Sequence, residues 1–195
     1  MSLNLSKGQQ SSPLNLSKSG GTDKYYVGLG WPDKGIDLDV TALVLGADGN
    51  VLSNAHVLFY NQKNKAEGFA DESLIHGGDN RTGAGPGDDE FIMVDLAAVD
   101  PRATEIAFVV TMHEVPSSVS FKDLGTAEPT FIHILENDKN GKEVLKYTLT
   151  DVAPEATCLQ FGSLIKSDTG AWTFQAVGAG GVADLGGVLA QYGVK

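Results

Sequence analysis

Short runs of apolar residues recur along most of this chain, separated by polar and glycine-containing stretches, which is the pattern of short β-strands. In the run LDVTALVL, residues 38–45, Leu38, Val40, Ala42 and Val44 share one face of an extended strand. The runs are rich in β-branched and aromatic residues and are bounded by Gly, Asn, Asp or Pro. We expect strands at residues 25–31, 38–45, 57–60, 91–96, 105–114, 130–136, 143–149, 158–166 and 172–177.

Helical periodicity is confined to two segments. Residues 182–192 carry an apolar stripe that includes Leu185, Val188 and Leu189, and residues 116–124 are a weaker candidate. Strands at short intervals with few helices predict a mainly β fold, a two-sheet β-sandwich of antiparallel character with one or two short helices. No linker divides the chain, so we expect residues 1–195 to form a single domain.

The N-terminus contains a repeated unit, LNLSKG at residues 3–8 and LNLSKS at residues 14–19. Its alternating pattern fits a short strand, and its Ser/Gly/Pro-rich surroundings fit an unstructured tail equally well. Segments 47–50 and 138–141 carry the Asp-Gly and Asn-Gly signals of tight hairpins.

The net charge of the chain limits the classes of partner that it can bind. The 14 Lys and Arg residues face 25 Asp and Glu residues, which gives a net charge of −11. Nucleic acids and anionic membrane surfaces would be repelled by this field, whereas cations would be attracted. No run reaches the ~18 apolar residues of a membrane span, and no apolar signal region opens the chain. With Cys158 as the single cysteine, we expect a cytoplasmic protein without membrane insertion or internal disulfides.

The acidic residues concentrate in three places. Asp37 and Asp39 lie two residues apart, so both point to the same face at the solvent-side start of their expected strand. The loop HGGDNRTGAGPGDDE, residues 76–90, combines four acids with five glycines, and Glu114 ends the expected strand 105–114. Glycines let a loop fold back and expose its carbonyl oxygens.

Carboxylates and bare carbonyls are the ligands of a hard cation. Calcium takes about 6–8 oxygens in adaptable geometry, whereas magnesium prefers a strict octahedron and zinc or copper calls for His or Cys spacing that the chain lacks. The loop does not match the twelve-residue EF-hand pattern. We therefore expect a different type of calcium site, with a solvated acidic loop as the alternative if the three acidic segments do not converge.

Several of these motifs together resemble the TerD family of bacterial tellurium-resistance and general stress proteins. The matching segments are VGLGW (27–31), DLDVTALVL (37–45), FYN (59–61), the loop 76–90, FVVTMHE (108–114) and the C-terminal part from residue 161. The resemblance covers essentially the whole chain. It implies a calcium-binding β-sandwich, holding one or two ions, with a cytoplasmic location and a role in resistance to tellurite and other chemical stress, without a defined enzymatic activity.

Transferred to the matching positions, the resemblance implies a set of candidate ion ligands. These are Asp37, Asp39, Asp79, Asn80, Asp88, Asp89, Glu90 and Glu114, with Asn61 and the carbonyls of Gly78 and Gly83 as additions. The chain departs from the family pattern at Ala84 and Pro86, which replace two acids of the loop, and this predicts weaker ion binding. Residues 115–124, VPSSVSFKDL, replace a basic helix of the family, so a partner surface formed there is expected to differ.

Two functional classes follow. The first is a calcium-binding stress-response protein that acts as a binding or scaffolding module for protein partners. The second is a metal-dependent enzyme, such as a hydrolase, that uses the same carboxylates; a purely structural ion is a further alternative. The glycine-rich segment 178–183 superficially suits a dinucleotide site, but too little chain follows for a βαβ unit, so we expect a tight turn there.

Overall fold

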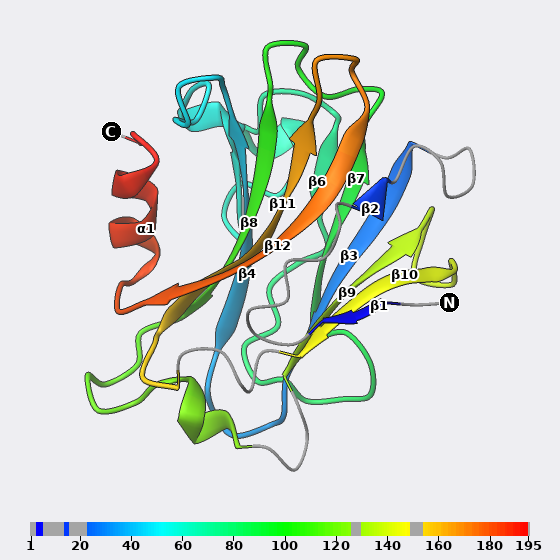
Figure 1. Cartoon of the computed structure of the whole chain (residues 1–195). Helices are drawn as coiled ribbons and strands as arrows, with labels where there is room; N and C mark the ends of the chain where they lie inside the picture. The colour runs from blue at the N-terminus through cyan, green and yellow to red at the C-terminus, as the bar shows by residue number, and fades with distance from the viewer. Residues whose placement is uncertain (1–2, 6–13, 16–22, 126–129, 149–153, 195) are drawn as a thin grey trace.

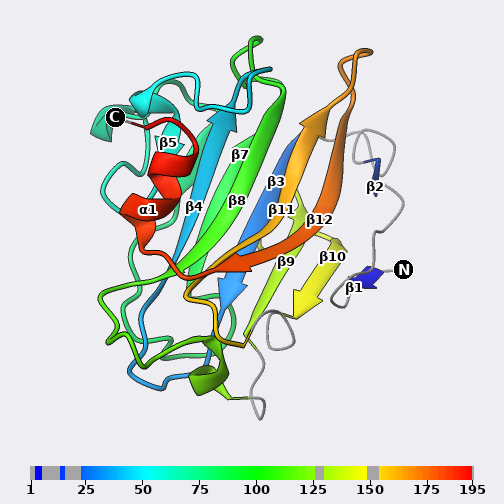
Figure 2. The same cartoon turned by 60° about the vertical axis from the view of Figure 1, so that its left-hand side comes forward.

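Two six-stranded sheets pack face to face in a β-sandwich (Figures 1 and 2). The computed structural model describes residues 3–5, 14–15, 23–125, 130–148 and 154–194. The strand order is β1-β10-β9-β3-β7-β6 in the first sheet and β2-β12-β11-β8-β4-β5 in the second. Among the described strands the pair β1–β10 is parallel and the other pairs are antiparallel. The mainly β fold with two antiparallel sheets is therefore confirmed.

The elements have the following bounds. The first sheet comprises β1 (Leu3–Leu5), β10 (Glu143–Thr148), β9 (Phe131–Glu136), β3 (Lys24–Gly30), β7 (Glu90–Asp95) and β6 (Leu74–His76). The second sheet comprises β2 (Leu14–Asn15), β12 (Trp172–Gly181), β11 (Cys158–Lys166), β8 (Glu105–Met112), β4 (Leu38–Leu45) and β5 (Val57–Leu58). One α-helix, α1 (Leu185–Gln191), follows β12, and short 3-10 turns occur at Asn54–His56, Lys65–Glu67 and Phe121–Leu124.

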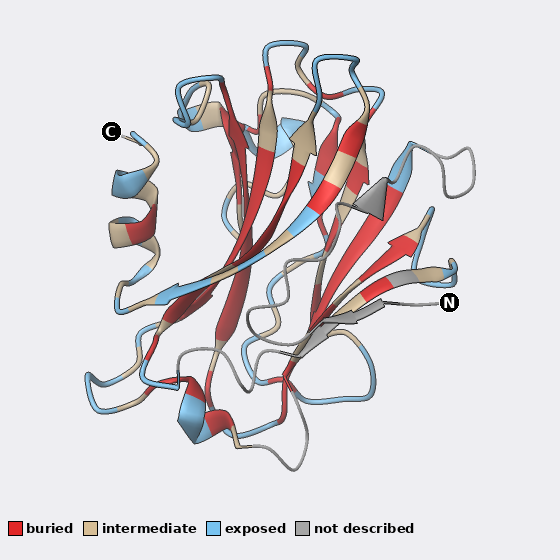
Figure 3. Cartoon of the chain, in the orientation of Figure 1, coloured by how far each residue is buried: buried red, intermediate tan, exposed pale blue. Residues whose placement is uncertain are grey.

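The core lies between the two sheets, and Figure 3 shows that the central strands are buried along much of their length. Val27 and Leu29 of the first sheet and Val40 and Phe108 of the second belong to one large cluster of buried side chains. Val27 and Leu29 lie two positions apart on β3, so both point to the same, inner face of the first sheet.

Helix α1 covers part of the outer face of the second sheet (Figure 2). Val188 of the helix packs with Leu43, Leu45 and Val109, which point away from the main core. Strand β4 is thus buried on both faces, which explains why its sequence is apolar at nearly every position.

Several elements differ from the expectation. The helix expected at residues 116–124 is wrong, because this stretch forms only the 3-10 turn Phe121–Leu124, closed by a capping box between Ser120 and Asp123. Strand β12 continues to Gly181 through the glycines expected to form a turn, so α1 begins three residues later than predicted. The repeat at the N-terminus contributes β1 and β2, and the rest of it lies outside the described residues. Strand β6 was not predicted.

No helix in the described part of the chain is long and apolar enough to span a membrane.

Candidate metal centre

The register of two neighbouring strands brings acidic residues together at one end of the second sheet. Strands β4 and β8 are antiparallel, with Asp39 opposite Thr111. The pairing continues beyond the strands, because the backbone N–H of His113 donates to the carbonyl of Asp37 at 3.0 Å. Asp37 and Asp39 therefore lie beside His113 and Glu114, although more than 70 residues separate the two segments.

The loop that connects β6 to β7 adds a third carboxylate. One oxygen each from Asp37, Asp39 and Asp79 lie within 4.8 Å of one another. They face a cavity of about 270 Å³. The residues that line it are Asp37, Asp39, Tyr60, Asn61, Asp79, Arg81, His113 and Glu114. The predicted convergence of the three acidic segments therefore occurs for these carboxylates.

The site holds at least one carboxylate that is deeply buried. The sequence predicts Asp39 on the solvent side of its strand, yet this residue is only 2% exposed. Burial raises the pKa of the Asp39 carboxyl to about 7, and the nearby Glu90 and Asp37 carboxylates add to this rise. Burial also raises the pKa of Asp37, an effect that His113 and Arg81 oppose. Without a cation, this arrangement disfavours the charged forms of both groups.

Local counter-charges compensate the cluster only in part. Arg81 Nε lies 3.6 Å from Asp37 Oδ2, but the Arg81 side chain is 68% exposed, and His113 Nδ1 lies 3.3 Å from Asp39 Oδ2. Asp37 Oδ1 and Asp39 Oδ2 are both buried and accept no hydrogen bond from any described residue. Such oxygens are costly unless a cation or donor satisfies them.

These donors fit a hard cation. Three carboxylates, the amide oxygen of Asn61 and the exposed carboxylate of Glu114 offer oxygen ligands only, which is the donor set of calcium rather than of a soft transition metal. Of the ligands expected from the sequence, Asp37, Asp39, Asn61, Asp79 and Glu114 are gathered around this one cavity.

Asn80 and Asp89, two other expected ligands, brace the loop. Asn80 Nδ2 donates to Asp89 Oδ1 at 2.9 Å, and Asp89 Oδ2 accepts the backbone N–H of Trp31 at the same distance. The Asn80 side-chain oxygen also accepts the N–H of Gly83 at 3.3 Å. These bonds fix the ends of the loop that carries Asp79.

Glu90 lies inside the sandwich. Its Oε2 accepts the backbone N–H of Val40 at 2.8 Å and is 3.6 Å from His76 Nε2, and both side chains are fully buried. The carboxylate therefore connects β7 to β4, one residue along from Asp39.

Asp88 points to a different part of the molecule, the outer face of the first sheet. Its carboxylate accepts hydrogen bonds from the Tyr26 hydroxyl at 3.0 Å and pairs with His133 Nε2 at 2.9 Å, and His133 Nδ1 lies 3.5 Å from Glu143. Desolvation and the neighbouring Asp88 carboxylate raise the pKa of Tyr26. The cluster fastens the end of the loop to β3 and β9.

The two glycines predicted as carbonyl ligands have backbone roles. Both have positive φ angles, 130° at Gly78 and 66° at Gly83. The Gly78 N–H donates to His76 Nδ1 at 3.2 Å, and Gly83 packs so closely on Trp31 that a Cβ would meet the indole ring at 2.6 Å.

Three residues at the cavity were not predicted from the sequence. Tyr60 and Arg81 each adjoin a predicted ligand in sequence, Asn61 and Asn80, which is the one signal that could have identified them. His113 belongs to an expected strand, which predicts a structural role for it, yet its Nδ1 atom lies 3.3 Å from the Asp39 carboxylate.

Comparison with known proteins gives a consistent family assignment. The family model described as TerD domain matches residues 1–192. The chain is 41% identical to the tellurium resistance protein TerD of Alcaligenes sp. and 34% identical to general stress protein 16U of Bacillus subtilis (strain 168). Each alignment covers 100% of this chain and 99% of the relative.

Solved structures support the fold. A homologue of telluride resistance protein (TerD) from Streptomyces coelicolor A3(2) superposes with a TM-score of 0.69 at 21% identity, covering 87% of this chain and 96% of the other. A crystal structure of a protein of unknown function gives a TM-score of 0.71 at 18% identity, covering 90% and 99%.

Proposed function

The chain belongs to the TerD family, and from this premise we propose that it is a calcium-binding stress-response protein that acts as a binding or scaffolding module. The observation that carries the proposal is the cluster of Asp37, Asp39 and Asp79, whose oxygens lie within 4.8 Å and include two buried atoms without hydrogen bonds from described residues. Three carboxylates at this separation repel one another unless a cation lies between them.

The residues of the cavity have distinct parts in this proposal. Asp37, Asp39 and Asp79 hold the ion, and Asn61 and Glu114 at the rim contribute further oxygens. The bound ion supplies positive charge that adds to the partial compensation by Arg81. Because Asp79 belongs to the loop between β6 and β7, the residues that hold the ion also tie this loop to the second sheet.

The biological role that we propose is inferred from the names of the relatives. They are named as tellurium resistance proteins, a general stress protein and a chemical-damaging agent resistance protein. We place this chain in the same kind of response, in the cytoplasm, acting through protein partners.

Calorimetry tests the ion. After chelator treatment, titration of the full chain with calcium should give saturable heat and a higher melting temperature, because a ligand that binds only the folded state stabilises it. The absence of both binding heat and a shift in melting temperature at millimolar calcium would refute the proposal. In a tellurite-challenged strain lacking the protein, Asp37→Asn should fail to restore growth; full rescue by an unstable Asp37→Asn protein would instead indicate a purely structural ion.

A metal-dependent hydrolase is the second candidate. The observation in its favour is a hollow of about 460 Å³ that adjoins the ion cavity and shares Asp39, Tyr60, His113 and Glu114 with it. Calcium-dependent turnover of ester or phosphate substrates that disappears in Asp39→Asn would establish this alternative.

A further inference from the structure

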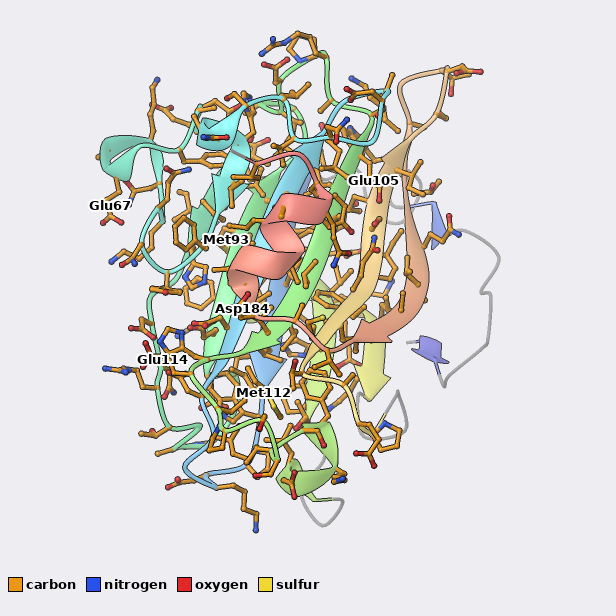
Figure 4. The ribbon with its side chains drawn as sticks, turned by 90° about the vertical axis from the view of Figure 1, so that its left-hand side faces the viewer. Glu67, Met93, Glu105, Met112, Glu114 and Asp184 are labelled. Atoms are coloured by element: carbon orange, nitrogen blue, oxygen red, sulfur yellow. The ribbon has the colours of Figure 1, made fainter. Side chains whose placement is uncertain are left out.

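The larger hollow lies beside the candidate metal centre, at the end of the second sheet near the start of α1. Figure 4 views this side, with Asp184 at the beginning of the helix and Glu114 below it. One wall is the segment after β8, and the opposite wall is the connection from β12 to α1. The volume of about 460 Å³ is within the range of ligand-binding pockets.

The wall next to the helix is held in place by Thr157. Its hydroxyl donates to the carbonyl of Ala183 at 2.9 Å and accepts the N–H of the same residue at 3.1 Å. The carbonyl of Thr157 also accepts the N–H of Met112 at 2.9 Å, which joins this wall to β8. Hydrogen bonds to the backbone therefore hold the wall next to the helix against β8.

Two buried polar side chains line the hollow without a hydrogen bond from any described residue. Thr111 is 1% exposed, and its Oγ1 has no such partner. Asp39 is 2% exposed, and its Oδ2 has none either, although His113 Nδ1 is 3.3 Å away. The Thr111 hydroxyl is free to form a hydrogen bond with a ligand in the hollow, whereas the Asp39 carboxylate is shared with the ion cavity, and leaving either atom unsatisfied has a cost.

The lining is acidic. Asp39, Glu114 and Asp184 contribute carboxylates, and the residues lining the hollow include neither Lys nor Arg. A divalent ion together with Arg81 would offset three of the five carboxylates of the two adjoining cavities, which leaves two negative charges uncompensated. The hollow therefore favours a cationic, donor-rich ligand even when the metal centre is filled.

An apolar rim accompanies these charges. Val182 is 79% exposed, more than the other exposed large hydrophobic residues of the described chain, Ile75 and Val177. Val115 and Pro116 line the facing wall.

We propose that this hollow binds a basic segment of a partner protein, with a Lys or Arg side chain beside Asp184 and an adjacent apolar residue on Val182. The inference rests on the binding-module part of the proposed function and names the chemistry of the partner. A long basic side chain matches both features, because its apolar stem packs on the rim while its charged end reaches the carboxylates.

Fluorescence anisotropy with the full chain in saturating calcium tests the inference. The probe is a short fluorescein-labelled peptide in which Arg and Leu alternate, and the comparison peptide carries Glu in place of each Arg. The basic peptide should bind saturably. Asp184→Asn, which can still cap α1 through its side-chain oxygen, should weaken binding about tenfold, and Val182→Ser about threefold or more.

Asp168→Asn is the matched control, because it removes one carboxylate from the β11–β12 turn at the opposite end of these strands. It should bind the basic peptide as the unmodified chain does. Equal affinity of all three variants would overturn the inference, since general attraction to a protein of net charge −11 would then explain binding. Tighter binding of the acidic peptide would also overturn it.

The failures of the two proposals are separable, because Asp184 and Val182 are not among the candidate ion ligands. Calcium uptake in calorimetry without binding of the basic peptide overturns the inference alone. Peptide binding that responds to Asp184→Asn in a chain that takes up no calcium supports the inference and refutes the calcium site.

Discussion

Glu90 joins the two sheets of the sandwich through Val40. The Oε2 atom of Glu90, on β7 of the first sheet, accepts the backbone N–H of Val40, on β4 of the second sheet, at 2.8 Å. Glu90 is 1% exposed, and His76 Nε2 lies 3.6 Å from the same oxygen. The last acid of the glycine-rich loop therefore supports the strand that carries Asp39, and it acts from inside the core.

Glu90→Ala is expected to destabilise the protein by about 3 kcal/mol, because it leaves a buried N–H unsatisfied and opens a cavity. Glu90→Gln keeps an acceptor for Val40 and should cost about 1 kcal/mol or less. Urea unfolding followed by tryptophan fluorescence measures both. Glu72→Ala, at a side chain that is 78% exposed, is the control and should change stability by no more than about 0.5 kcal/mol.

Asp39→Asn should abolish calcium uptake and stabilise the ion-free protein. The neutral amide removes the repulsion that Asp39 experiences from Glu90 and Asp37, so we expect a gain of about 1 kcal/mol at about pH 8 in the presence of chelator. Calorimetry and chemical unfolding of the same preparation check the two effects. If Asp39→Asn bound calcium as tightly as the unmodified chain, or if Asp168→Asn lost binding equally, the assignment of the ion to this cavity would be wrong.

Short runs rich in β-branched and aromatic residues predict much of the fold, because such runs form strands where Gly, Asn, Asp or Pro bound them. The period of two in a strand also places Asp37 and Asp39 on one face. The helical pattern of residues 116–124 is misleading, because Pro116 and three serines leave too little helix propensity and the segment forms only a 3-10 turn.

The three consecutive acids Asp88, Asp89 and Glu90 make contacts in three different parts of the molecule. Asp88 pairs with His133 on the outer face, Asp89 holds the loop through Trp31, and Glu90 points into the core. Composition and spacing identify the run as acidic, but the direction of each side chain depends on where β7 begins and which strand it meets. The sequence could therefore predict a cluster of acids but not which of them face the cavity and which make structural contacts.

Gly28→Ala is expected to destabilise the protein by about 2 kcal/mol through overpacking. A Cβ at this position of β3 would lie 2.5 Å from His133 Nε2 and 2.6 Å from the Asp88 carboxylate, so the pair that fastens the loop must separate. Gly186→Ala is the matched control. Its Cβ would meet Asp184 at an ordinary 3.5 Å, and a gain of up to about 1 kcal/mol is expected because alanine favours the helix. Thermal unfolding compares the two, and equal stability of Gly28→Ala and the unmodified chain would contradict the packing described for this cluster.

Calcium affinity should depend on pH through Asp39. Burial, assisted by the Glu90 and Asp37 carboxylates, raises the pKa of Asp39 to about 7, so below that pH the ion-free protein holds a proton that calcium must displace. Affinity should therefore fall about tenfold for each pH unit below about 7 and level off above it. The stability of the ion-free protein depends on pH in the opposite direction to calcium affinity. The folded-state pKa exceeds the value of 3.8 for the free group, so the contribution of Asp39 to stability is greatest below about pH 4 and declines as pH rises to about 7. Calorimetry in two buffers of different ionisation enthalpy, at about pH 6 and about pH 8, should detect proton release only at the lower pH. Affinity that stays constant between these values would show that Asp39 is already ionised before calcium arrives, and that the charge of the site is compensated by a group other than the ion.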